Sequence, residues 1–267
     1  MAKKKVNFFT YVDESYYHFV LPYIFSICHD TDATVEVVLK SKQDFFNIYG
    51  KRLANMCIKD KMFSIDYSDR VSIKDISVYK VPAGNLIPHI VRFLITPKNV
   101  FKSKYTYITD CDIIVTEKLY VKALENNLAG MLKNRTCFFN IKREGRDSLS
   151  GVHFVRNKEY YDKLEGFLMV FVNEYKGQDQ AVNKLNLLSD EGFLFYFDKN
   201  TLGEPEKLTK DNIRILPGEH ISPNRGKTYN EIFKELTKDS NWERAFHQFD
   251  DKIINLFNIK KLRRNEF

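Results

Sequence analysis

The sequence Tyr105-Thr-Tyr-Ile-Thr-Asp110-Cys111-Asp112-Ile-Ile-Val115 is an apolar, β-branched and aromatic run interrupted by two aspartates one residue apart. A run of this composition is typical of a buried strand. Burying unpaired carboxylates costs free energy. The two aspartates are therefore expected where the strand ends and a divalent cation neutralises their charge. Side chains two apart on an extended chain project to the same side, and carboxylate oxygens suit Mg²⁺ or Mn²⁺. We therefore expect Asp110 and Asp112 to hold a metal ion that in turn binds nucleotide phosphates.

The same spacing occurs a second time, in Asp30-Thr31-Asp32. These residues follow a predicted helix, and no apolar strand leads into them, so a solvated turn is expected there. The apolar flanks of Asp110 and Asp112 set that pair apart, although a strand-end turn with exposed acids is the alternative. Context, and not the pattern alone, has to confirm such a motif.

Composition places the chain among globular proteins. Its 267 residues can form one large α/β domain or two small ones. Hydrophobic residues make up 43% and aromatic residues 14%, which supplies a core and argues against disorder. Four scattered cysteines without a Cys-x-x-Cys pair indicate neither a zinc site nor a disulfide framework, so a cytoplasmic location is expected.

The net charge of +7 favours a polyanionic partner such as nucleotide phosphates, nucleic acid or an anionic membrane surface. Nucleic acid is disfavoured because the basic residues are scattered and no nucleic-acid-binding signature is present. We also find no signal-peptide core and no apolar run long enough to span a bilayer.

The first forty residues predict a βαβ unit. An apolar strand over 6–12 ends in the turn and helix-cap signature Asp13-Glu14-Ser15, a helical pattern covers 16–27, and a second strand covers 34–39. Such a unit implies a parallel sheet. Because ligands of these sheets bind beyond the carboxyl ends of the strands, the turn over 10–16 is a candidate nucleotide lip.

The rest of the chain predicts a single α/β domain with a mixed, mostly parallel central sheet flanked by helices. Further helices are expected over 43–55, 87–94, 160–175 and 181–187 and from 117 onward. The segments 71–73 and 76–81 supply one or two short strands, and further strands are expected over 129–132, 136–141, 150–155 and 192–197. We expect residues 1–240 to form the catalytic domain and 241–267 a basic amphipathic tail. The segment 253–264 either lies on an anionic membrane or docks on the body.

Several polar residues in this framework are candidate ligand contacts. Arg92 lies on a short predicted helix before the central strand, and its guanidinium could donate two parallel hydrogen bonds to a diphosphate. Asp179 begins a helix, where it is either a plain N-cap or, with Gln180, a contact to a sugar. His220 lies in a polar, cationic segment, and imidazole can complete an octahedral Mn²⁺ site. Arg225 and Lys227 can meet phosphate.

These motifs resemble, in order from Val6 to Lys227, those of the GT-A-fold glycosyltransferases, most closely bacterial family 8 (lipopolysaccharide galactosyl- and glucosyltransferases). The resemblance implies a Rossmann-like GT-A fold, a UDP-hexose donor carrying galactose or glucose, and Mn²⁺, with Mg²⁺ the lesser candidate. It implies transfer, favouring retention, to a cell-surface glycan on a lipid carrier. This would happen in the cytoplasm, at the inner face of the inner membrane.

The resemblance also assigns roles. It implies Asp110, Asp112 and His220 as metal ligands, Asp179 and Gln180 as catalytic contacts to the transferred sugar, and a donor site formed by Thr10, Tyr11, Val12, Asp13, Tyr16, Arg92, Cys111, Ser150, Gly151, Arg225 and Lys227. Two segments depart from the family pattern: Leu149-Ser150-Gly151 stands for Asn-Ala-Gly, and Asn224-Arg-Gly-Lys227 for a Lys-Pro-Trp ending.

Two other functions remain open from the sequence. One is a nucleotidyltransferase, which the acidic turn Asp13-Glu14-Ser15 disfavours because a Gly-rich basic loop is normal there. The other is a non-catalytic carbohydrate- or membrane-surface-binding protein on the same fold. For the enzyme, retention needs no separate protein base, whereas inversion needs a carboxylate such as Asp147 or Glu191.

Overall fold

The computed structural model describes residues 6–58, 70–79, 88–98, 102–134, 138–139, 153–174, 178–201, 218–221 and 229–257. A six-stranded sheet at its centre has the strand order β3-β2-β1-β4-β7-β6. Its strands are β1 (Val6–Val12), β2 (Thr34–Leu39), β3 (Val71–Asp75), β4 (Tyr105–Ile108), β6 (Phe138–Phe139) and β7 (His153–Arg156). The pairs β3·β2, β2·β1 and β1·β4 are parallel, whereas β7 runs antiparallel to β4 and β6. The predicted mixed, mostly parallel sheet is thus confirmed.

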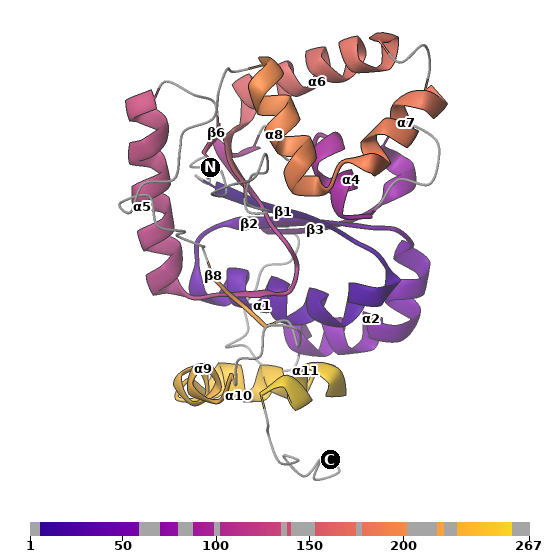
Figure 1. Ribbon diagram of the computed structural model, residues 1–267. Helices are drawn as coiled ribbons and strands as arrows, with labels where there is room; N and C mark the ends of the chain where they lie inside the picture. Colours follow the sequence, from indigo (N-terminus) through magenta and orange to yellow (C-terminus); the bar gives the residue numbers. More distant parts are fainter. Residues whose placement is uncertain are drawn as a thin grey trace.

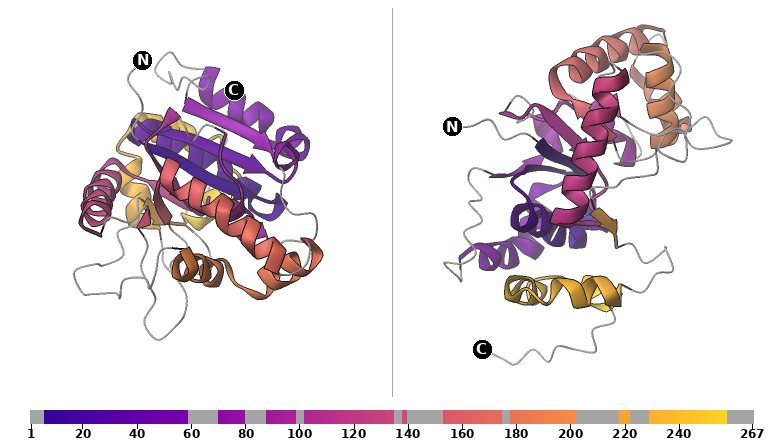
Figure 2. Two further views of the ribbon diagram at one scale, coloured as in Figure 1. Left: turned by 90° about the horizontal axis from the view of Figure 1, so that it is seen from above. Right: turned by 90° about the vertical axis from the view of Figure 1, so that its left-hand side faces the viewer.

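Helices cover both faces of this sheet (Figure 1). One face carries α1 (Val20–Asp30), after the 3-10 turn η1 (Glu14–Phe19), and α2 (Lys42–Ile58). The other carries α4 (Pro88–Leu94), α6 (Asn157–Glu174), α7 (Gln178–Leu187) and α8 (Asp190–Thr201). The helix α5 (Glu117–Asn134) lies alongside, and α9 (Asn230–Leu236), α10 (Ser240–Phe246) and α11 (Asp251–Leu256) form a further layer beyond α1 and α2 (Figure 2).

Two hydrophobic clusters hold these layers together. Neighbouring residues of a strand point to opposite faces, so Phe8 enters the cluster with α1 and α2, while Phe9 enters the cluster with α4, α6 and α8. In β2, Val37 and Val38 divide in the same way. A strand buried on both faces is largely apolar, which explains why β1 and β2 are rich in hydrophobic residues and do not alternate between apolar and polar.

Two predicted strands were wrong, and of the one or two expected over 71–73 and 76–81 only the first is a strand in the described residues. Residues 129–132 lie within α5, and 192–197 lie within α8. A short apolar run does not by itself distinguish a strand from a buried helix. The start of α8 is marked instead by Ser189, whose hydroxyl accepts a hydrogen bond from Gly192 N at 3.0 Å. In the predicted strand over 76–81, Ile76–Val78 form a 3-10 turn because the Asp75 carboxylate accepts from Ser77 N at 2.9 Å; residues 80–81 lie outside the described residues.

The C-terminal helices pack against the body of the protein. Trp242, Phe246, Phe249, Ile253 and Phe257 are all buried in the cluster that contains α1. The apolar side chains at the start of the predicted amphipathic segment therefore contact protein and are not presented to a membrane. The basic residues from Lys260 to Arg264 lie outside the described residues. Among the described helices, none combines the length and hydropathy needed to cross a bilayer.

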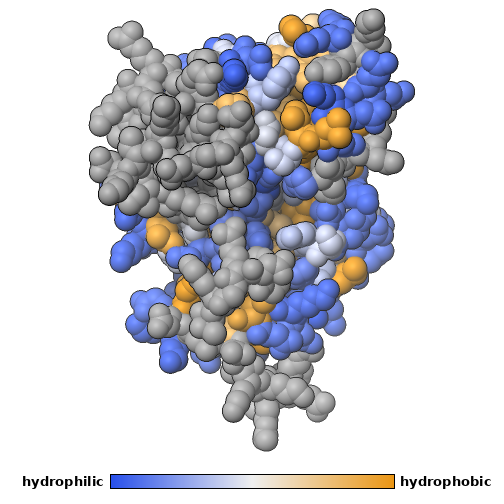
Figure 3. Space-filling model, viewed as in Figure 1, coloured by the Kyte–Doolittle hydropathy of each residue, from blue (hydrophilic) through white to orange (hydrophobic). Residues whose placement is uncertain are grey.

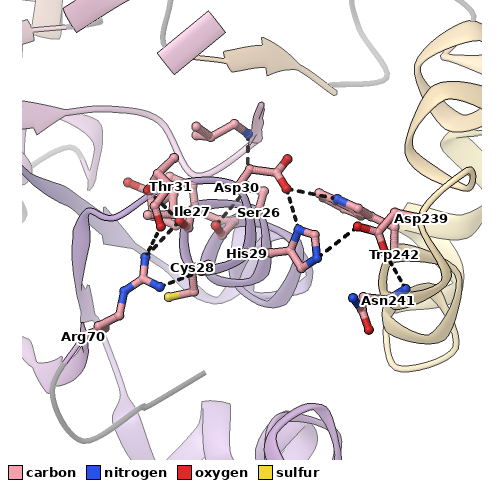
Figure 4. Close-up of polar contacts among 12 residues, drawn as sticks. Ser26, Ile27, Cys28, His29, Asp30, Thr31, Arg70, Asp239, Asn241 and Trp242 are labelled. Atoms are coloured by element: carbon pink, nitrogen blue, oxygen red, sulfur yellow. Dashed lines mark hydrogen bonds and ion pairs between the residues drawn. The ribbon is translucent and has the colours of Figure 1, made fainter. Parts of the chain in front are cut away.

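A polar cluster joins α1 to α10 (Figure 4). His29 Nδ1 lies 2.5 Å from Asp30 Oδ1, and His29 Nε2 lies 3.2 Å from Asp239 Oδ2. Trp242 Nε1 donates to the same Asp30 oxygen at 3.4 Å. The expected solvated turn at Asp30 and Asp32 is therefore wrong for Asp30, whose side chain is only 14% exposed. In the folded protein, residues of α10 cover the Asp30 side chain.

His29 makes the attachment of α10 dependent on pH. Burial lowers the pKa of His29, but the hydrogen bond to Asp30 and the charges of Asp30 and Asp239 outweigh burial, so the net shift is upward. A raised folded-state pKa stabilises the protein below the ordinary value of about 6.5, and this contribution is lost as the pH rises through the folded-state pKa. We expect the free energy of unfolding of wild-type protein to fall over that range relative to His29→Gln.

Urea denaturation at a series of pH values measures this difference. The control is His247→Gln, because His247 is exposed at the end of α10. It should follow the wild-type pH profile. If His29→Gln also follows the wild-type profile, the imidazolium does not contribute to this contact.

Candidate metal and nucleotide site

The two aspartates lie where the central strand ends, as the sequence predicted. β4 stops at Ile108, and β5 (Ile113–Val115) starts directly after Asp112. The turn is anchored at Thr109, whose N–H donates to Phe9 O at 3.0 Å and whose hydroxyl lies 2.8 Å from the Tyr23 hydroxyl. Since β1 pairs with β2 on one side and β4 on the other, this turn stands where the strand order reverses, the usual ligand position in such sheets.

A second, two-stranded sheet brings the histidine to this turn. β8 (Gly218–His220) pairs antiparallel with β5, and His220 lies opposite Ile113. Ile221 N donates to Asp112 O at 2.8 Å and extends the pairing. His220 Nδ1 consequently lies 3.3 Å from Asp112 Oδ1. The pairing of β5 with β8 therefore explains how residues 108 positions apart meet.

Asp110, Asp112 and His220 form a group of possible metal ligands. One ligand atom from each lies within 4.8 Å of the others. Asp112 and His220 are buried, and Asp110 is partly buried. Two carboxylates with one imidazole are donors that Mn²⁺ accepts readily, and Mg²⁺ prefers the oxygens. The chemistry of the donor set therefore fits the divalent ion that the sequence resemblance implies.

A buried arginine stands next to this group. Arg92 of α4 is 4% exposed. Its Nη1 pairs with Asp110 Oδ1, and its Nη2 lies 2.9 Å from Asp190 Oδ2. Burial lowers the pKa of Arg92, but the charges of Asp110 and Asp190 outweigh this and raise it. The guanidinium is therefore a permanent positive charge held between two carboxylates.

Asp190 is a site residue that the sequence reasoning missed. It stands in the first turn of α8, in front of the segment that was expected to be a strand. Ser189 followed by two acidic residues is a helix-start signal. This signal predicts a carboxylate at the N-terminus of a helix, and that helix covers the same face of the sheet as α4. Its neighbour Glu191, a candidate base for inversion, lies in the same turn.

Arg92, Asp110 and Asp112 face a cavity of about 260 Å³, which is slightly smaller than typical small-molecule sites of about 300–1,000 Å³. Its lining consists of Tyr11, Val12, Asp13, Tyr16, His89, Arg92, Asp110, Cys111 and Asp112. The predicted nucleotide lip at the end of β1 thus meets the acidic turn. His89, exposed on α4, also lines the cavity, although no role was predicted for it from the sequence.

Two cavity groups remain neutral. Burial, followed by the charges of Asp112 and Asp110, raises the pKa of the Cys111 thiol well above its usual range. Cys111 therefore lines the cavity with a small, uncharged thiol and is not a thiolate ligand. Burial and the Asp112 charge also raise the pKa of Tyr16. Tyr16 is 43% exposed, so it offers a ring face and a neutral hydroxyl to a ligand.

The other predicted contacts either lie outside the cavity lining or fall outside the described residues. Thr10 is buried in β1, and it does not line the cavity. Asp179 and Gln180 are exposed in the first turn of α7, also outside the cavity lining. Ser150, Gly151, Arg225 and Lys227, together with Asp147, lie outside the described residues. The helices α6 and α7 carry exposed apolar side chains at Met169, Val170 and Leu187. Figure 3 shows hydrophobic surface in its upper part, where Figure 1 places α6, α7 and α8.

No protein-family model and no curated protein matches the chain. Among solved structures, GlyE of Streptococcus pneumoniae TIGR4, a glycosyltransferase, aligns over 87% of this chain and 50% of its own at 15% identity and a TM-score of 0.46. This chain therefore spans about half the length of GlyE. An active-site mutant of LgtC, whose wild-type form is a galactosyltransferase, aligns over 87% and 95% at 13% identity and a TM-score of 0.46. The bifunctional glycosyltransferase WbbM aligns over 67% and 36% at 13% identity and a TM-score of 0.38. All three are glycosyltransferases, the class of protein that the sequence motifs resemble.

Proposed function

We propose that this protein is a metal-dependent glycosyltransferase that uses a nucleotide sugar. The observation that carries the proposal is the group of Asp110, Asp112 and His220, whose ligand atoms lie within 4.8 Å of one another at the carboxyl end of the sheet. The finer proposal is a UDP-hexose donor with galactose or glucose, Mn²⁺ as the metal, and transfer to a lipid-linked cell-surface glycan with retention.

The acidic turn supplies the diphosphate site. When bound by Asp110, Asp112 and His220, a divalent ion supplies Lewis-acid stabilisation of the leaving diphosphate. Arg92 adds a fixed positive charge on the same side of the cavity. The acidic side chains alone would repel a diphosphate, so this arginine favours the anionic donor over a neutral sugar.

The lining residues from β1 and the turn after it suit the nucleoside. Tyr11, Val12 and Asp13 lie at the carboxyl end of β1, and Tyr16 exposes part of its ring next to them. An aromatic face, a backbone edge and a carboxylate are the groups that a base and a ribose require. Asp179 and Gln180 of α7 are the proposed contacts to the transferred sugar. A diphosphate oxygen then takes the acceptor proton, so retention requires no protein base.

Calorimetric titration of UDP- and GDP-sugars, in Mn²⁺ and then in EDTA, tests the proposal. We expect one UDP-hexose to bind only with Mn²⁺ and to hydrolyse slowly to UDP. Turnover of nucleoside triphosphates with release of pyrophosphate would point instead to a nucleotidyltransferase. A lack of metal-dependent binding by every sugar nucleotide would contradict the proposal and favour a non-catalytic protein.

Replacing Arg92 should change metal and donor affinity in opposite directions. Arg92→Gln removes the cation that pairs with Asp110, so Mn²⁺ alone should bind more tightly. The diphosphate loses a charge-assisted contact, which is worth about 1.5–3 kcal/mol, so UDP should bind roughly 10- to 100-fold more weakly. Separate titrations with Mn²⁺ and with UDP at saturating Mn²⁺ measure the two effects.

The control is Arg156→Gln, since Arg156 pairs with Glu159 at 2.9 Å at the far end of β7. Both affinities of this variant should match wild type. A parallel loss of Mn²⁺ and UDP affinity in Arg92→Gln would show that Arg92 supports the fold of the site and does not contact the ligand.

A further inference from the structure

We infer that Gly218 is a positioning residue for the metal site: the lack of a side chain at this point of β8 allows His220 to reach Asp110 and Asp112. This inference rests on the metal site of the proposed function. Gly218 lies two residues before His220, opposite Val115 of β5.

The space at Gly218 is occupied by the backbone of the neighbouring strand. A Cβ added there would lie 2.3 Å from Ile114 O, 2.8 Å from Ile114 C and 3.0 Å from Val115 Cα. These are main-chain atoms of a buried strand, so no side chain can rotate away to relieve the clash. A glycine inside a strand commonly marks such a close backbone approach.

A side chain at Gly218 would therefore move β8. An ordinary contact begins near 3.4 Å, so the strands would have to separate by roughly 1 Å, whereas metal–ligand distances tolerate only about 0.2 Å. Among the described strands, β8 pairs with β5 alone. The movement would pass directly to His220 and to the Ile221 N–H that donates to Asp112 O at 2.8 Å.

The chain contains a matched control for the added methyl group. A Cβ at Gly166, in α6, would meet nothing within 4 Å. Gly166→Ala should therefore leave the metal site unchanged, and the helix should gain slightly in stability because alanine is the better helix former. A difference between the two alanine variants reports the backbone contact and not the loss of a glycine as such.

The experiment is calorimetric titration of Mn²⁺, without nucleotide, into wild type, Gly218→Ala and Gly166→Ala. Unfolding of each in EDTA is followed by circular dichroism. We expect Gly218→Ala to bind Mn²⁺ about 10- to 100-fold more weakly, in the range seen when groups that orient metal ligands are lost. Its unfolding midpoint in EDTA should fall, because the clash is with β5, whose residues Ile113, Ile114 and Val115 belong to the core cluster that contains α1. A cooperative unfolding transition above the temperature of the titration shows that the variant is folded when Mn²⁺ is added.

The outcomes separate this inference from the function on which it rests. Wild-type affinity in Gly218→Ala overturns the positioning role and leaves the metal site intact. A wild-type protein that binds no Mn²⁺ overturns the metal site itself, and the positioning role with it. If Gly218→Ala does not fold, hydrogen exchange of the Ile221 amide in wild type decides. Protection in EDTA supports a preformed β5–β8 contact, and fast exchange overturns it.

Discussion

Asp112→Asn should remove Mn²⁺-dependent donor binding and lower turnover of the UDP-sugar by more than about 100-fold, since even groups that merely orient metal ligands cost 10- to 100-fold. Asparagine keeps the size of the side chain and an oxygen that can face His220 Nδ1. It removes the negative charge that a divalent ion requires. The loss should therefore fall on metal affinity and not on folding.

The measurement is initial-rate hydrolysis of the donor over a range of Mn²⁺ concentrations, together with the unfolding midpoint in EDTA. Asp32→Asn is the matched control because Asp32 is the last residue of the other Asp-x-Asp sequence in the chain, Asp30-Thr31-Asp32. Its carboxylate accepts from the Tyr120 hydroxyl at 3.3 Å, an interaction that asparagine can retain. Asp32→Asn should keep wild-type activity, and full activity in Asp112→Asn would rule out Asp112 as a ligand.

Arg70→Ala should lower the free energy of unfolding by about 3–5 kcal/mol, a large share of the 5–15 kcal/mol typical of a domain. The Arg70 guanidinium donates to the carbonyls of Ile27, Cys28, Thr31 and Ala33, with its two shortest bonds, at 2.5 and 2.6 Å, to Thr31 and Cys28 (Figure 4). These carbonyls end α1 and lead into β2, so without Arg70 several half-buried acceptors lose their donor.

Urea denaturation measures the loss. Arg70→Lys keeps the charge but not the planar fork of five donors, so it should recover only part of the stability. Arg156→Ala, which loses one pair with Glu159, should cost less than about 1 kcal/mol. A loss of similar size in Arg70→Ala would show that water satisfies the carbonyls equally well.

Local sequence patterns are sufficient to predict several elements of this protein. The βαβ start, the N-cap at Asp13 and the end of the central strand at Asp110 and Asp112 all follow from the order of apolar, turn-forming and acidic residues. The cap and the strand end each span fewer than ten residues, and the βαβ start lies within residues 6–39, so each could be recognised without the rest of the chain. The resemblance added His220 as a ligand, and the structure brings it to the acidic turn.

Contacts between distant segments depend instead on the assembled fold. α8 is a helix because Phe193 and Phe197 pack into the cluster above the sheet, whereas the same aromatic run reads as a strand in isolation. The ion pair of Arg92 with Asp190 joins residues 98 positions apart, and His29 meets Asp239 from another layer. A sequence pattern predicts which face of each helix or strand is apolar. Which of these faces pack together depends on the free energy of burying apolar surface, summed over the assembled layers.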